Sequence, residues 1–139
     1  RDENRLTDFI APIRDAGCRV SIFVAADKVQ IDAAHKIGAA VVELHTGRYC
    51  DALSQGRADD GENELRRLQE MARHAHELGL EVHAGHGITY ETVQPIAAFP
   101  EVVELNIGHF LIGEAIFRGI EPAILEMRRL MDEIRTDAP

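Results

Sequence analysis

Short apolar runs alternate along the chain with longer segments in which apolar residues recur every three or four positions. The four runs are "RVSIFV" (19–24), "VVELH" (41–45), "LEVHAG" (80–85) and "VVELNI" (102–107). They are rich in Val, Ile and Phe, and most are bounded by glycine or polar turn residues, which is typical of β-strands. We therefore predict four strands.

The segments between these runs have the spacing of amphipathic helices. The predicted helices span 3–16, 28–37 and 62–78, and a last one begins near Pro122. Asp27 stands where its side chain can cap the second of them. Strands that alternate with helices predict a parallel sheet joined by right-handed crossovers.

One helical segment is ambiguous from its sequence. A helix that began at Thr89 in "ITYETVQPIAAF" would be kinked at Pro95, because proline cannot donate the backbone hydrogen bond of a helix interior. A short helix that begins nearer Pro95 fits the sequence equally well.

The polar segment "GRYCDALSQGRADDGEN" (47–63) interrupts the alternation. A loop of this length inside a compact domain is usually an active-site lid or is disordered. We therefore expect residues 48–61 to form a loop that could close over a ligand. No linker or low-complexity tract divides the chain, so residues 1–139 are predicted to belong to one domain.

Polar residues on one face of the strands distinguish between two kinds of α/β fold. Glu43 and His45 share one face of their strand. Glu104 and Asn106 do the same in theirs, and His83 lies mid-strand. Strands of an open doubly wound sheet are covered on both faces and are almost purely apolar, whereas a barrel with outer helices has room for polar interior residues. Because a (β/α)8 TIM barrel takes eight strands and about 250 residues, the four predicted strands correspond to half of such a barrel, about four βα units.

Composition and charge narrow the possible partners. The chain has 139 residues, 45% hydrophobic and 28% charged, as in globular proteins. Its net charge of -9 argues against nucleic acid and anionic membranes, which bind clustered cations.

No apolar run approaches the roughly 18 residues of a membrane-spanning helix. We expect a cytoplasmic protein in which Cys18 and Cys50 are reduced thiols. Because Arg1 rather than Met opens the chain, we expect a piece of a longer protein.

Histidines stand at the carboxyl ends of three predicted strands, where barrels of this type carry their active sites. They are His45 in "ELHTG", His86 in "HAGHG" and His109 in "NIGHF". His83 and His86 resemble a metal-binding pair, but residues three apart on a strand point to opposite faces. We therefore predict no metal site, and no pattern indicates a cofactor. The histidines that we assign to the surface are His35, His74 and His76.

Glycines follow two of the strands. Gly87 and Gly108 would let the backbone approach a ligand closely, and "HFLIGEAI" after Gly108 has the pattern of a helix start. Exposed amides at a helix start favour an anion. Phosphate binding is therefore one interpretation of these glycines, and an ordinary turn is the other.

Acid–base chemistry is the second candidate function of the strand ends. A histidine with an unperturbed pKa of about 6.5 suits proton transfer near neutral pH. Glu43 is open to two interpretations, catalysis or a satisfied polar network inside the barrel. The other members of that network would be His45, His83 and Glu104. For His86, which lies beyond the strand between two glycines, packing is the weaker explanation.

Several motifs resemble a known family when they are taken in order. "AGCRVSIFVAAD", "VELHTG", "HAGHGITY", "ELNIGHFLIGEAIFRG" and "EMRRLM" are similar to the C-terminal half of pyridoxine 5'-phosphate synthases. The resemblance covers essentially the whole chain and implies a cytoplasmic TIM-barrel enzyme of vitamin B6 biosynthesis, usually an octamer. Such enzymes condense 1-deoxy-D-xylulose 5-phosphate with 3-amino-2-oxopropyl phosphate, both phosphorylated small molecules, into pyridoxine 5'-phosphate, phosphate and water.

The resemblance also implies roles for individual residues. It makes His86 the catalytic proton donor and Gly87 a substrate-binding position. It makes Gly108 and His109 the phosphate-binding pair, and Glu43 the carboxylate that stabilises a transition state.

The chain departs from the family in one respect. The N-terminal half of the family supplies an Asn-x-Asp-His segment, a His and Arg pair and another Glu, and none of these is present. We therefore expect the 139 residues alone to be inactive. The family implies no role for His45 or His83. Two other interpretations stay open, another sugar-phosphate isomerase or lyase and a non-catalytic half barrel that binds phosphate or a partner.

Overall fold

The computed structural model describes residues 3–136, and these contain a parallel sheet with helices between its strands. The strands are β1 (Ser21–Val24), β2 (Val41–His45), β3 (Glu81–Gly85) and β4 (Val102–Asn106). Each strand pairs with the next in the order β1-β2-β3-β4, and every pairing is parallel. The four predicted strands and their parallel arrangement are confirmed, and the fold is that of part of a (β/α)8 barrel.

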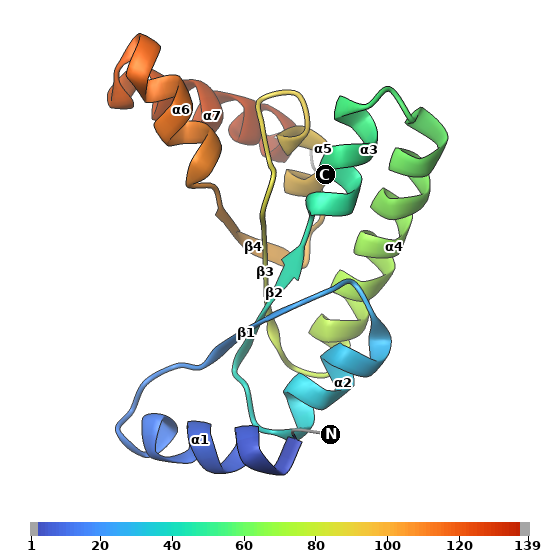
Figure 1. Cartoon of the computed structure of the whole chain (residues 1–139), viewed down its shortest axis with the longest axis vertical. Helices are drawn as coiled ribbons and strands as arrows, with labels where there is room; N and C mark the ends of the chain where they lie inside the picture. The colour runs from blue at the N-terminus through green and yellow to red at the C-terminus, as the bar shows by residue number, and fades with distance from the viewer. Residues whose placement is uncertain (1–2, 137–139) are drawn as a thin grey trace.

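One helix precedes the first strand, and the others connect the strands or follow the last one (Figure 1). They are α1 (Glu3–Asp15), α2 (Lys28–Lys36), α3 (Gly47–Ser54), α4 (Ala58–Glu77), α5 (Val93–Ala97), α6 (His109–Arg118) and α7 (Ile120–Thr136). The carboxylate of Asp27 accepts a hydrogen bond from the backbone N–H of Gln30 at 3.1 Å, which confirms the predicted cap of α2. The short helix near Pro95 is also confirmed, because α5 holds only five residues.

The predicted loop over residues 47–63, with its lid over 48–61, is wrong. This segment forms α3 and the first turns of α4. Tyr49, Cys50 and Ala52 are buried on the inner side of α3, and Leu53 fills the space beside Gly61 of α4. The charged residues that made the segment look like a loop lie on the outer sides of two helices that pack on each other.

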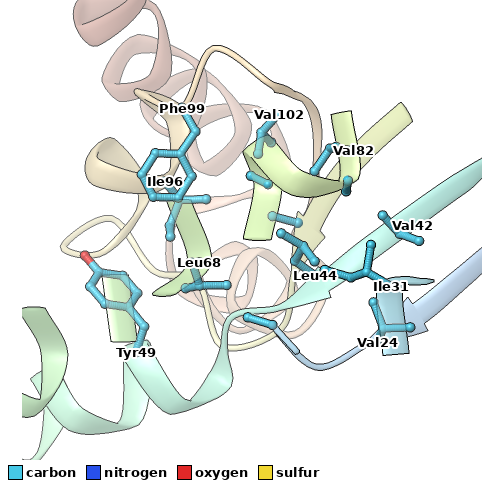
Figure 2. Packing of buried hydrophobic residues seen from close by; sticks show 14 of the residues in the cluster. Val24, Ile31, Val42, Leu44, Tyr49, Leu68, Val82, Ile96, Phe99 and Val102 are labelled. Atoms are coloured by element: carbon cyan, nitrogen blue, oxygen red, sulfur yellow. The ribbon is translucent and has the colours of Figure 1, made fainter. Parts of the chain in front are cut away.

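The hydrophobic core lies on one face of the sheet (Figure 2). Val42 and Leu44 of β2 point into it with no more than 1% of their surface exposed. Ile31 of α2, Leu68 of α4 and Ile96 of α5 cover them from the helices. Burial of large aliphatic side chains on one face of alternating strands is what holds the helices to the sheet.

The opposite face of the sheet is polar and open. Register puts Phe23 of β1 beside Glu43 of β2, and Glu43 beside His83 of β3. Glu43 is half-buried, and Phe23 is 52% exposed. In a closed barrel this face would be the interior. Within residues 3–136, β1 and β4 each pair on one side only, which leaves two open sheet edges.

Histidines outside the strands are placed partly as predicted. His35 and His76 are exposed, but the surface assignment of His74 is wrong. The Nε2 atom of His74 lies 2.6 Å from a carboxylate oxygen of Asp32, so its ring joins α4 to α2. Hydrogen bonds from Lys28, and then from His74, keep the pKa of Asp32 below its usual value. Of the helices in the described part of the chain, none is both long and apolar enough to cross a membrane.

Candidate active site

A cleft of about 620 Å³ opens at the carboxyl ends of the strands. The residues that line it come from all four strand ends and the segments after them. They are Phe23, Glu43, His86, Gly87, Ile88, Thr89, Asn106, Ile107, Gly108, His109 and Phe110. The five residues to which the family resemblance assigns a role therefore lie around one cleft.

His86 begins the turn that follows β3. Its φ of 81° is in the left-handed region, which it occupies alone among the non-glycine residues of 3–136. Gly87 continues the turn with a φ of 80°. An L-residue rarely adopts this conformation, because its Cβ crowds the following carbonyl oxygen. The turn lifts the His86 side chain out of the strand pattern and exposes it at the cleft.

The end of β2 contacts this turn directly. The rings of His45 and His86 are stacked, with centroids 4.4 Å apart and planes 29° apart. The Oγ1 atom of buried Thr46 lies 2.6 Å from the carbonyl oxygen of His86. His86 therefore has both its ring and its backbone held by two consecutive residues, the last residue of β2 and the N-cap of α3.

Glu43 reaches its partner across a glycine. Asn106 of β4 donates a hydrogen bond from Nδ2 to Oε2 of Glu43 at 3.1 Å, although β3 runs between their strands. The space exists because Gly85 stands between them. A Cβ added to Gly85 would lie 2.4 Å from Oε1 of Glu43 and 3.1 Å from Cβ of Asn106. Gly85 is thus the residue that lets a β2 carboxylate and a β4 amide meet.

The third part of the cleft is the start of α6. Gly108 is its N-cap and has no side chain to bond the free N–H groups of the first turn, which His109 begins. A Cβ added to Gly108 would meet no atom within 4 Å, and both residues are exposed. Unpaired backbone donors and the positive end of the helix dipole face an open space here, an arrangement that suits an anion.

His83 belongs to a different cluster from His86. Its Nε2 lies 2.8 Å from a carboxylate oxygen of Glu81 and its Nδ1 lies 3.2 Å from one of Glu104. A bulge in the β3–β4 pairing, which leaves Val103 as an extra residue, brings Glu104 rather than Val103 beside His83. The predicted network is therefore real for His83 and Glu104, but Glu43 and His45 have other partners. No group of three potential metal ligands occurs in the described residues 3–136.

Buried groups of α3 support the turn from below. A Cβ added to Gly87 would lie 3.2 Å from Cβ of Cys50, so the thiol side chain packs directly under the turn. Burial raises the pKa of the Cys50 thiol above its usual value, and it raises the pKa of Tyr49 to about 12. Both groups therefore stay protonated near neutral pH and act as packing residues. Cys50 and Cys18 are free thiols, as predicted.

Comparison with known proteins identifies the family. The family model described as "Pyridoxal phosphate biosynthesis protein PdxJ" matches residues 1–133. The chain belongs to the PdxJ family. This confirms the family resemblance that the motifs indicated.

Relatives of the PdxJ family support the same assignment at high identity. The chain is 70% identical over 135 residues to "Pyridoxine 5'-phosphate synthase" of Ruegeria pomeroyi and 71% identical over 135 residues to that of Roseobacter denitrificans. It is 55% identical over 137 residues to that of Caulobacter vibrioides. These matches cover 97% to 99% of the chain but 54% of each relative. The chain thus spans about half the length of the relatives that it matches.

Sequence reasoning assigned no role to two residues that contact the site, Thr46 and Asn106. Both follow or end a predicted strand in motifs that drew attention for their histidines. The alternation of its strand put Asn106 on the face of Glu104, but nothing local signals its bond to Glu43, 63 positions away. The hydroxyl contact of Thr46 depends on the turn of another strand, and no local pattern signals it.

Proposed function

We propose that this chain supplies the C-terminal half of a pyridoxine 5'-phosphate synthase barrel. The complete barrel condenses 1-deoxy-D-xylulose 5-phosphate with 3-amino-2-oxopropyl phosphate and releases pyridoxine 5'-phosphate, phosphate and water. The observation that carries the proposal is the single cleft that Glu43, His86, Gly87, Gly108 and His109 line together. It is supported by family membership and by the printed names of relatives at 55% to 71% identity.

In this proposal, His86 is the proton donor of the reaction. Schiff-base formation, loss of water and ring closure all require protons to move to or from oxygen and carbon, and a positioned imidazole does this near neutral pH. Exposure of the His86 ring at the cleft supports the role. Gly87 binds substrate beside it, where the absence of a side chain leaves the backbone accessible.

Glu43 is the carboxylate that stabilises a transition state. Its Oε2 is anchored by Asn106, which fixes the carboxylate against the cleft without neutralising it. A carboxylate held in this way favours positive charge that develops on a nitrogen or carbon of the substrate. The half-buried position of Glu43 strengthens that interaction relative to water.

Gly108 and His109 bind a substrate phosphate at the start of α6. The unpaired amides and the helix dipole supply the attraction, and the imidazole of His109 adds a donor. Phosphate groups act as handles that fix both substrates, so that their condensation becomes effectively unimolecular.

The remaining parts of the proposal concern the whole protein. Residues 1–139 form the C-terminal half of one TIM-barrel domain, and an N-terminal half closes the two open edges and completes the active site. The assembled protein is a cytoplasmic homo-octamer. Because the second half supplies further catalytic groups, the 139 residues alone are inactive.

A chimera tests this function. Residues 1–139 replace the matching 54% of the Ruegeria pomeroyi relative, and the product is followed with both substrates present. We expect the chimera to form pyridoxine 5'-phosphate and the isolated chain to form none. The unmodified relative and its N-terminal half alone are the controls.

Two outcomes would contradict the proposal. If the chimera folds but forms no pyridoxine 5'-phosphate under conditions in which the relative forms it, the proposed function is wrong. Turnover of a single phosphosugar without the amino ketone would instead support a sugar-phosphate isomerase or lyase.

A further inference from the structure

We infer that His45 and Thr46 are positioning residues, which hold His86 in the orientation from which it acts. The inference rests on the proposed role of His86 as proton donor. Neither His45 nor Thr46 is among the described residues that line the cleft, and Thr46 is completely buried. They therefore act on the reaction through His86 and not through the substrate.

Thr46 holds the backbone of the turn. Its N–H donates to the carbonyl oxygen of Gly85 at 2.9 Å, which extends the pairing of β2 with β3 by one residue. Its hydroxyl lies 2.8 Å from that same oxygen and 2.6 Å from the carbonyl oxygen of His86. A hydroxyl has a single proton, and the contact with the His86 oxygen is the shorter of the two, so we assign the proton to the His86 carbonyl. This bond holds His86 in a left-handed conformation that its own backbone disfavours.

His45 holds the ring. Its imidazole stacks on that of His86 at a centroid distance of 4.4 Å, and Phe23 packs on the His45 ring at 5.1 Å. Within residues 3–136, neither ring nitrogen of His86 makes a hydrogen bond. A stacked ring therefore fixes the plane of His86 and leaves both of its nitrogens free for proton transfer, which a hydrogen-bonded partner would not do.

The His45 ring has a backbone partner of its own. Its Nδ1 accepts a hydrogen bond from the backbone N–H of Gly47 at 3.1 Å. This bond ties the His45 ring to the first residue of α3, so the ring that stacks on His86 is itself fixed to the backbone.

Gly47 provides the space for both rings. A Cβ added to Gly47 would lie 2.4 Å from Cε1 of His45 and 3.0 Å from Cδ2 of His86. The residue is buried at the first position of α3, where its backbone has no positive φ. The backbone of Gly47 can accept alanine, but the added Cβ would displace the stacked rings. Gly47→Ala therefore disturbs the stack without changing either histidine.

The test measures kcat and KM in the chimera for His45→Ala and Thr46→Val. Misplacement of a reacting group by about 1 Å costs up to about 100-fold in rate, and we expect kcat to fall by about 10- to 100-fold with KM changed less than about threefold. His45→Phe keeps a flat ring and Thr46→Ser keeps the hydroxyl, so both should retain most of kcat. His76→Ala, an exposed histidine on α4, is the matched control and should leave both constants unchanged.

The same variants in a His86→Ala background separate a positioning role from a structural one. If His45 and Thr46 act through His86, their substitution lowers the residual rate no further. A further loss in that background would overturn the inference, as would unchanged kcat in the His86-containing variants. If a variant does not fold, NMR of the His45→Phe and Gly47→Ala proteins decides between the two roles, through the ring-current shift that the ring at position 45 imposes on the His86 ring protons. The shift should persist in the first and be lost in the second, and the reverse would overturn the inference.

Failure of the proposed function is recognised separately. Full turnover by His86→Ala itself would remove the role of that residue. Loss of turnover in His86→Ala, together with unchanged kcat in His45→Ala and Thr46→Val, would overturn only the positioning inference.

Discussion

The two sides of the candidate active site are built in opposite ways. At the β2–β3 side, the His86 turn rests on buried Thr46, on the stacked His45 ring and on the thiol side chain of Cys50. At the β4–α6 side, Gly108 has open space around it, and no residue of α6 is buried. The His86 turn is closely surrounded by side chains of this chain, whereas Gly108 at the start of α6 is not.

The apolar face of α6 shows the same difference. Ile112, Ile116 and Phe117 are 60%, 76% and 87% exposed, which is unusual for large apolar side chains. α6 contacts α7 and lies at the far end of the molecule from α1 and α2 (Figure 1). α6 is held at its start, where Phe110 packs edge-on against Tyr90 at 4.7 Å and joins Leu111 against the core, whereas its exposed apolar residues have no such contacts within the described chain.

The largest effect on kcat is expected at the His86 turn. In the chimera, His86→Ala should lower kcat by about 100- to 10,000-fold, because general acid catalysis contributes that much. KM should change little, since the phosphates supply the binding energy. Steady-state kinetics with both substrates measures this, and His76→Ala serves as the control. Full turnover by His86→Ala would show that His86 has only a packing role.

A smaller effect is expected at Gly85, which lies between Glu43 and Asn106. Gly85→Ala puts a Cβ 2.4 Å from Glu43 and 2.9 Å from the carbonyl oxygen of Asn106. We expect the free energy of unfolding of the chimera to fall by about 1–3 kcal/mol, as for overpacked interiors, and kcat to fall with it. Urea denaturation measures the first quantity. Asn106→Leu removes the bond to Glu43 without adding a clash, so it should lower kcat with less loss of stability.

A pair of glycine substitutions compares the two sides directly. Gly87→Ala combines a φ of 80° with a Cβ 3.2 Å from Cys50 and should destabilise the chimera by about 1–3 kcal/mol. Gly108→Ala has an ordinary φ and open space, so the free energy of unfolding should change by no more than about 0.5 kcal/mol. Gly108→Ala should nevertheless weaken the binding of inorganic phosphate, measured by calorimetry. Equal destabilisation by the two substitutions would contradict the comparison.

The smallest effect concerns the thiol under the turn. Cys18 is exposed and should react quickly with iodoacetamide, whereas buried Cys50 should react slowly, as peptide mass spectrometry can show. Because the folded pKa of Cys50 is raised above its usual 9.0, both states hold the proton below that pH. Above it the unfolded chain ionises first, so stability should decline as pH rises toward the folded pKa. In Cys50→Ala this alkaline decline should shrink, and an unchanged decline would assign it to other groups.

Much of the fold could be predicted because its signals are local. The four strands and the cap at Asp27 follow from composition, spacing and turn residues within a few positions, whereas the local sequence left two alternatives for the helix near Pro95. The segment 47–63 could not be predicted in the same way. Its helices depend on burial of Tyr49 and Cys50 against the rest of the core and on packing of α3 against α4. The partner of His74 likewise lies 42 positions away, so no local pattern reveals it.

The sequence by itself determined which residues stand at the carboxyl ends of the strands, because strand alternation and chain order depend only on neighbouring residues. It also determined the family, through motifs that lie in order along the chain. Only the tertiary structure decided how those residues meet. The bond from Asn106 to Glu43 across Gly85, the stack of His45 on His86 and the hydroxyl contact of Thr46 each join residues about 40 or more positions apart. Such contacts arise from strand register and from the space that glycines leave, which no single segment encodes.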